Sequence, residues 1–172
     1  MTNEGLLDPL VRVFQPDGGI PNSNLPLVLW KGRLPIGMRD GRAACRLYQM
    51  NDWAGTWVYT VYPFWHFHTR GHEVLGCVSG RARIGFGGEG GIVADVEPGD
   101  VAIVPAGVGH RKLDATTDFL MAGGYPPRQQ GNIVRPGEMD AREIAAELRG
   151  VKLPLTDPIT GKADGVVALW RG

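Results

Sequence analysis

Short runs of β-branched, aromatic and other apolar residues fill the chain from residue 57 to residue 124, and glycine- or proline-containing turns separate them. Such runs are typical of β-strands, because branched and aromatic side chains pack well on a pleated surface. We expect six strands, over residues 57–68, 73–78, 81–86, 92–96, 101–104 and 119–124. The 26 glycines and 13 prolines therefore indicate turns rather than disorder. Six short strands at close spacing predict an all-β sandwich or barrel.

The segments on either side of this region carry fewer signals. Residues 11–14 and 25–30 are predicted to be short extended additions that pad the barrel or cover a sheet edge. Residues 139–149 predict one C-terminal helix, because apolar residues recur four apart and a glycine follows its end. Residues 166–170 are expected to form a last strand. No linker or repeat divides the chain, so we expect one domain over residues 1–172.

Charge and composition exclude several classes of partner. Eighteen Lys and Arg balance eighteen Asp and Glu, and no basic run appears, so no nucleic-acid partner is expected. The apolar segments are too short to span a bilayer, so no membrane partner is expected either. Residues 1–5 lack the basic and apolar regions of a secretory signal, which predicts a cytoplasmic protein. Cys45 and Cys77 form no CxxC pair and suggest no disulfide framework.

Three of the four histidines, together with one glutamate, fall into a pattern that suggests a metal site. Side chains alternate along a strand, so His66 and His68 project to the same face. A tight turn follows, and it lets Glu73 face them from the next strand. A later turn containing proline and glycine brings His110 over the same cavity. Three imidazoles and one carboxylate suit a divalent ion such as Fe, Mn, Ni, Co or Zn.

These segments resemble the paired motifs of the cupin superfamily, small β-barrels that include RmlC-like sugar epimerases, oxalate-degrading enzymes and many dioxygenases. The matching positions are His66, His68, Glu73 and Gly80 in the first motif, and Gly99, Pro105, Gly107 and His110 in the second. Thr60 replaces the leading Gly and Asp114 the final Asn, and neither is a ligand position. The resemblance implies a single cupin jelly-roll barrel with its motif core at about residues 57–125. It also implies His66, His68, Glu73 and His110 as metal ligands, and a homodimer.

Two further residues are candidates for roles at the site. His72 competes with Glu73 for the fourth ligand position, but only Glu73 leaves the six residues before Gly80 that the cupin motif has. We therefore expect His72 in the turn or on the opposite face, solvated, with a catalytic contribution as the alternative. Tyr62 shares strand parity with His66 and is predicted to point into the barrel, where it would contact substrate or move a proton.

Three functions fit this pattern. The first is a metal-dependent enzyme of the dioxygenase, isomerase or decarboxylase type, in which a small oxygen-rich ligand reaches open positions on the metal. The second is a metal-bearing protein that binds or senses a small ligand without turning it over. The third is an epimerase-like cupin without metal, which needs a histidine base and a tyrosine acid. The intact ligand pattern argues against the third.

Overall fold

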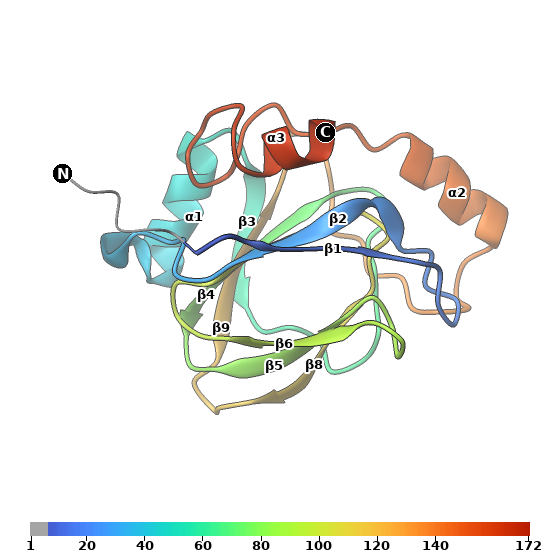
Figure 1. The fold of residues 1–172 in the computed structure, drawn as a ribbon, viewed down its shortest axis with the longest axis horizontal. Helices are drawn as coiled ribbons and strands as arrows, with labels where there is room; N and C mark the ends of the chain where they lie inside the picture. Colours follow the sequence, from blue (N-terminus) through green and yellow to red (C-terminus); the bar gives the residue numbers. More distant parts are fainter. Residues whose placement is uncertain (1–6) are drawn as a thin grey trace.

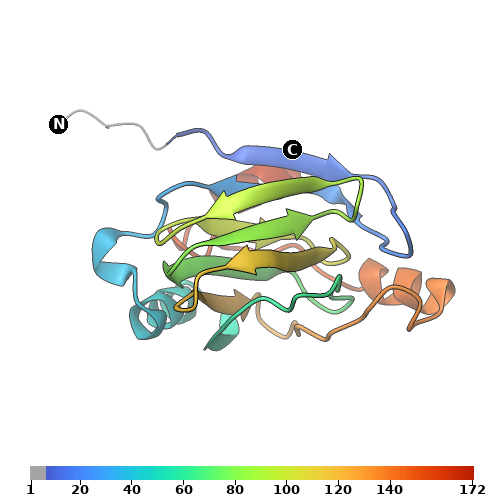
Figure 2. The same cartoon turned by 90° about the horizontal axis from the view of Figure 1, so that it is seen from below.

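Two antiparallel sheets face each other in the computed structural model, which describes residues 7–172 (Figure 1). The larger sheet has the order β1-β2-β7-β4-β9-β3, with bounds Leu10–Phe14, Ser23–Trp30, Val101–Val104, Glu73–Ser79, Leu120–Tyr125 and Ala54–Tyr59. The smaller sheet has the order β6-β5-β8, with bounds Ile92–Val96, Ala82–Phe86 and His110–Ala115. Figure 2 shows these three strands side by side in one layer. The predicted all-β jelly-roll is confirmed. The N-terminal pentapeptide without a signal pattern lies outside the described residues.

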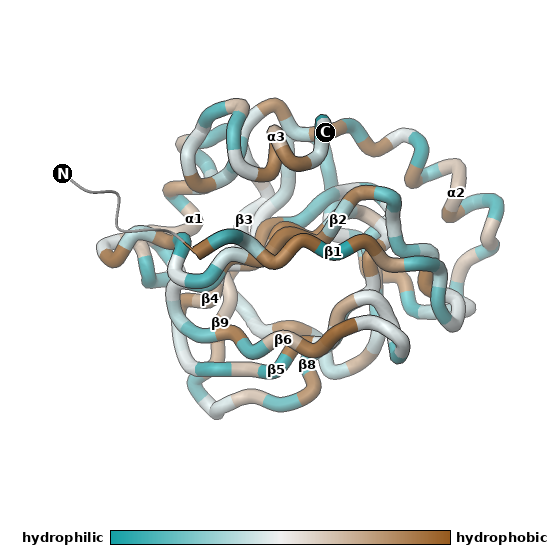
Figure 3. The backbone as a smooth tube through the Cα atoms, in the orientation of Figure 1, coloured by the Kyte–Doolittle hydropathy of each residue, from teal (hydrophilic) through white to brown (hydrophobic). Residues whose placement is uncertain are grey.

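Alternation along the central strands gives the larger sheet two apolar faces. On β4, Leu75 and Cys77 point between the two sheets, whereas Val74 and Val78 point to the outer face. Strand β7 is buried along its whole length, so it reads as a continuous apolar run. Figure 3 shows hydrophobic residues gathered along these central strands. One core therefore lies between the sheets, and a second lies outside the larger sheet.

Helices cover the second core. Helix α1 (Gly41–Met50) follows the short 3₁₀ helix η1 (Ile36–Met38), and α3 (Val166–Arg171) lies near the C-terminus. Both α1 and α3 pack on the outer face of the larger sheet, whereas α2 (Ala141–Arg149) lies at one end of it (Figure 1). Within residues 7–172, no helix has the length and apolar character that crossing a membrane requires.

Most of the predicted elements are present. The extended additions are β1 and β2, which pair with each other, and the predicted helix is α2. Strand β8 and helix α1 were not expected, although Asp40 caps α1 through the amide of Ala43. The two cysteines are free thiols, in agreement with the absence of a disulfide framework.

Two predicted strands are wrong. The strand expected over residues 57–68 ends at Tyr59, because the segment that follows contains Pro63, which cannot donate to a ladder. The last strand expected over residues 166–170 is helix α3. Its buried residues lie three and four apart, so their spacing favours one face of a helix over one face of a strand.

Candidate metal centre

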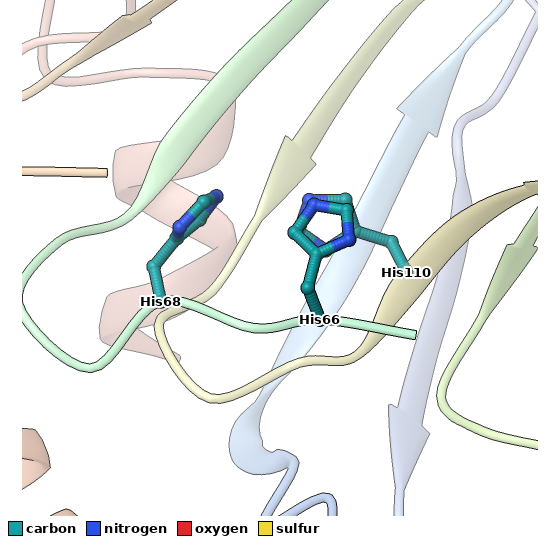
Figure 4. Close-up of side chains that lie close together, drawn as sticks. All are labelled: His66, His68 and His110. Atoms are coloured by element: carbon teal, nitrogen blue, oxygen red, sulfur yellow. The ribbon is translucent and has the colours of Figure 1, made fainter. Parts of the chain in front are cut away.

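Three chain segments meet at one end of the space between the sheets. His66 lies in the irregular segment after β3 and pairs with His110, the first residue of β8, through reciprocal backbone hydrogen bonds of 3.0 and 3.3 Å. The amide of Phe67 donates to the carbonyl of Val134 at 2.9 Å, which keeps this segment extended. His66 and His68 therefore project to the same side, as the sequence predicted, even without a regular strand. Figure 4 shows their rings rising from one segment, with His110 reaching toward His66.

His66, His68 and His110 form a buried group, which we call the histidine cluster. Their ligand-type nitrogens all lie within 4.8 Å of one another. The rings of His66 and His110 are 4.2 Å apart between centroids. Glu73, the first residue of β4, joins the cluster through its Oε2 atom, which lies 2.9 Å from Nε2 of His68 and 3.2 Å from Nε2 of His110. The structure thus brings together all four residues that the motifs predicted.

Backbone carbonyls fix the orientation of all three rings. Nδ1 of His66 lies 3.0 Å from the carbonyl oxygen of Phe64, and Nδ1 of His110 lies 3.1 Å from that of Val108. Nδ1 of His68 lies 2.6 Å from the carbonyl oxygen of Asn132. A carbonyl only accepts, so each Nδ1 carries the proton and donates it. The three Nε2 atoms are left for the interior of the cluster.

Burial and charge act in opposite directions on these groups. Burial lowers the pKa of His68, but the neighbouring Glu73 carboxylate outweighs it and raises the pKa above its ordinary value. Burial raises the pKa of Glu73, but His68 and His110 hold it well below its usual range. For His66, burial and the charge of His110 lower the pKa to about 3. In the metal-free site Glu73 therefore favours the charged form of His68, whereas burial keeps His66 neutral.

The cluster and Glu73 form the floor of a pocket of about 280 Å³, which we call the site pocket. The walls of the pocket are mostly apolar and aromatic. They come from β3, the segment after it, β4, β9 and the loop after β9. The wall residues are Trp57, Tyr59, Thr60, Val61, Tyr62, Leu75, Tyr125, Gly131 and Ile133. This volume lies just below the range of about 300–1,000 Å³ of small-molecule sites, so the pocket suits a small ligand. A larger groove of about 1010 Å³, between α1, α2 and the loop after β9, contains none of the three cluster histidines.

A turn in the second motif is attached directly to the first motif. The amide of Gly107 donates to the carbonyl of His68 at 2.8 Å. Gly107 has a φ of 92°, and a Cβ atom there would lie 2.5 Å from the carbonyl oxygen of Asn22. Only glycine suits such a position, because it adopts a left-handed conformation without a steric penalty and leaves room for the neighbouring backbone. The turn before His110 is thus fixed against the segment that carries His68.

His72 lies outside the site pocket. It is 3% exposed, so the expectation of a solvated ring is wrong. Its Nδ1 accepts a hydrogen bond from the amide of Ala106 at 2.9 Å, and its ring packs 4.7 Å from that of Trp170 on the outer face of the larger sheet. It does face away from Glu73, as the alternation along β4 predicted. A catalytic role for His72 has no support in this geometry.

Tyr62 lies in the wall of the site pocket, as its parity predicted. Its ring stacks on Phe64 with centroids 5.0 Å apart, and meets the ring of His66 edge-on at 5.6 Å. The side chain is 38% exposed, so it stands at the mouth of the pocket rather than at its floor.

Three residues at the site were not predicted by the sequence. Tyr125 ends β9 and donates its hydroxyl hydrogen to Oε1 of Glu73 at 3.3 Å. Trp57 of β3 donates its indole hydrogen to the Tyr125 hydroxyl at 2.8 Å. Asn132 holds His68 through its carbonyl, and its side-chain oxygen accepts from the amide of Thr69 at 3.1 Å. Two consecutive prolines after Tyr125 mark the end of a strand, but no local signal assigns these contacts.

The chemistry of the donor set fits a divalent ion. Imidazoles whose Nδ1 donates to a carbonyl, as in the histidine cluster, are common metal ligands once Nε2 is free of its proton. The buried cluster is therefore compatible with metal binding, although imidazole nitrogens do not distinguish among Fe, Mn, Co, Ni and Zn.

Comparison with known proteins agrees with the fold and the site. Residues 63–133, which include every matching position of the two motifs, match the family model described as Cupin. The chain is also 35% identical over 158 residues to the uncharacterized protein YjlB of Bacillus subtilis (strain 168), an alignment that covers 91% of this chain and 93% of that protein. The facing sheets, the two linked motifs and this similarity over nearly the whole chain show that the protein belongs to the cupin family.

Proposed function

We propose that the protein is a metal-dependent enzyme that acts on a small oxygen-rich molecule. In this proposal a divalent ion (Fe, Mn, Ni, Co or Zn) is held by His66, His68, His110 and Glu73. The observation that carries it is the orientation of the cluster, because a backbone carbonyl holds each Nδ1 and makes Nε2 the ring nitrogen that can bind an ion beside Glu73. A bound ion of this kind supplies a Lewis acid that polarises an oxygen of the substrate.

The residues of the chain favour a catalytic site over a closed structural one. The cluster and Glu73 lie at the floor of a pocket that small molecules can enter, whereas structural metal sites are enclosed by their ligands. Glu73 offers one carboxylate against the two charges of the ion, so the loaded site keeps a net charge of about +1 by addition over the ligand types. Such a site attracts an anion or a polarised oxygen.

A lysine beside the pocket favours an acidic substrate. Nζ of Lys112 donates to the hydroxyl of Thr60, which lines the pocket, at 3.0 Å. The ion pairs formed by residues 7–172 do not include Lys112. The carboxylate of a small acid would be attracted both to the positively charged metal site at the floor of the pocket and to the ammonium group of Lys112. We assign Tyr62, at the mouth, to contact with the same substrate.

The test is metal content followed by turnover. Protein purified without chelators is analysed for metal, stripped, and reloaded separately with Fe(II), Mn(II), Co(II), Ni(II) and Zn(II). Each form is supplied with a panel of small mono- and dicarboxylic acids, and oxygen uptake and product formation are measured. We expect about one ion per chain and turnover with at least one metal form.

The matched control is the His66→Ala/His110→Ala double variant. Turnover that is unchanged in this variant contradicts the metal role. An acid that raises the melting temperature of the loaded protein, but is recovered unchanged with every metal, identifies instead a small-ligand binding or sensor protein. The homodimer, the single domain over residues 1–172 and the cytoplasmic location stay predictions.

A further inference from the structure

Three neighbouring strands carry a row of polar side chains that ends at the site. The larger sheet places β3, β9 and β4 next to one another. Trp57 of β3 pairs with Gly123, which is two residues before Tyr125 on β9, and Gly124 pairs with Val74 on β4. Antiparallel pairing therefore places Tyr125 opposite Glu73.

Hydrogen bonds connect this row in one direction. The Trp57 indole has no acceptor, so it donates to the oxygen of Tyr125, at 2.8 Å. The Tyr125 hydroxyl hydrogen is then directed to Oε1 of Glu73, at 3.3 Å. The other oxygen of Glu73, Oε2, faces His68 and His110 at 2.9 and 3.2 Å. Each carboxylate oxygen thus has its own partners.

We propose that Tyr125, oriented by Trp57, is a positioning residue that holds Oε1 of Glu73 and so presents Oε2 alone to the histidine cluster. This inference rests on the proposed metal function, and it adds a residue that neither motif contains. The indole hydrogen of Trp57 occupies one side of the hydroxyl oxygen, and a carboxylate oxygen only accepts, so the Tyr125 hydroxyl is the donor to Glu73. Hydrogen bonds that orient metal ligands are typically worth about 10- to 100-fold in metal affinity.

The Tyr125 hydroxyl can be removed without changing the packing of the ring. Two glycines shape the space around the Tyr125 ring: a Cβ atom on Gly55 would lie 3.1 Å from Cδ2, and one on Gly131 would lie 2.1 Å from the hydroxyl oxygen. Phenylalanine fills the same ring space. Tyr125→Phe therefore removes the hydrogen bond to Glu73 and preserves the packing of the ring.

Tyr48→Phe is a matched control. The Tyr48 hydroxyl is buried and donates to the carbonyl of Ala122, also on β9, at 3.1 Å. It lies on the outer face of the larger sheet, away from Glu73. The two variants thus each remove one tyrosine hydroxyl that is bonded within the same part of the fold, and only one of them touches the site.

The first measurement uses metal-free protein. The chain has four histidines, so their imidazole nitrogen signals can be resolved by NMR, and His72 serves as an internal reference outside the site. We expect Tyr125→Phe to move the signals of His68 and His110, because the carboxylate that both rings contact is released. The His72 signal should stay, and Tyr48→Phe should leave the His68 and His110 signals unchanged.

The second measurement is the affinity for Co(II), Zn(II) and Mn(II), by competition with a chromophoric chelator. We expect Tyr125→Phe to weaken binding roughly 10-fold or more, and Trp57→Phe to weaken it less, since the hydroxyl remains. The Co(II) absorption spectrum should change in Tyr125→Phe, because the freed Oε1 can then approach the ion.

The two measurements separate this inference from the proposed function. The inference is overturned if the His68 and His110 signals do not change in Tyr125→Phe. It is also overturned if the wild type binds metal and Tyr125→Phe binds the same metal with equal affinity. A wild-type protein that binds none of these three ions, nor Fe(II) or Ni(II), overturns the proposed function. The metal-free signals then still decide whether Tyr125 positions Glu73.

Discussion

His68 and His72 lie four residues apart, and each is 3% exposed, yet their surroundings are opposite. His68 faces the space between the sheets, where a carbonyl accepts from one ring nitrogen and the Glu73 carboxylate lies against the other. His72 faces the outer core, where it packs on Trp170. The pKa of His68 is raised, because Glu73 outweighs the effect of burial, whereas burial lowers the pKa of His72 to about 4. A carboxylate partner, not burial, distinguishes the two histidines.

The two surroundings are nevertheless connected. The amide of Ala106 donates to His72, and the amide of Gly107, the next residue, donates to the carbonyl of His68. The turn that leads to His110 is therefore held from both sides of the larger sheet. His72 thus helps to hold the turn before His110 from the outer face of the sheet. This role explains why the histidine is buried although it does not line the site pocket.

The largest effect is expected on the outer side, in a Trp170→Ala variant. Trp170 is 6% exposed, packs on His72, and donates its indole hydrogen to the carbonyl of Pro26 at 2.9 Å. Its loss should lower the free energy of unfolding by about 3–5 kcal/mol, because a large cavity and an unsatisfied carbonyl remain. Urea denaturation measures this. Leu169→Ala, at a 38% exposed position of the same helix, is the control and should cost much less. Equal losses in both variants would show that α3 does not seal an outer core.

We expect His72 to contribute to the pH dependence of the free energy of unfolding. Its pKa is about 4 in the folded protein against an ordinary value of 6.5, so below pH 6.5 the unfolded chain binds a proton that the folded protein does not. Stability that is fully present above pH 6.5 is therefore lost as the pH falls toward 4, by on the order of 3 kcal/mol from this residue.

Unfolding free energies of metal-free wild type and His72→Gln, measured between pH 4 and pH 8, isolate this contribution. His66 is present in both proteins and cancels in the difference. We expect the difference between the two proteins to change across this window. A difference that is constant with pH would contradict a buried, neutral His72.

The smallest of the three expected effects is a loss of metal affinity. Comparing this loss in Glu73→Gln and His72→Gln tests whether Glu73 or His72 is the fourth metal ligand. Glu73→Gln keeps the size of the side chain but removes the charge, and it should weaken metal binding about 100-fold, which corresponds to about 2.8 kcal/mol. His72→Gln should lower stability and leave the metal affinity within a few-fold of wild type. Competition titration measures both. The reverse result, with His72→Gln losing the metal, would reassign the fourth ligand.

Much of the fold follows from local patterns. Apart from β8, the strands after Gly71 are predicted closely, because their short apolar runs are bounded by turns. The errors occur where a local pattern is ambiguous. The apolar run at residues 166–170 fits a strand or a helix, and only its packing against the larger sheet makes it α3. The strand expected to carry His66 is irregular, and pairing with His110 replaces the missing ladder.

The sequence by itself determined the cupin motifs and the four residues that meet at the site. It also determined the choice of Glu73 over His72, by spacing. These features depend only on residue type and on distance along the chain. The tertiary structure decided which carbonyls fix the imidazoles, that His72 is buried against Trp170, and that Trp57 and Tyr125 reach Glu73. Those contacts join residues as much as 98 positions apart, namely His72 and Trp170. Their geometry is set by strand order and register, which no local pattern of residues encodes.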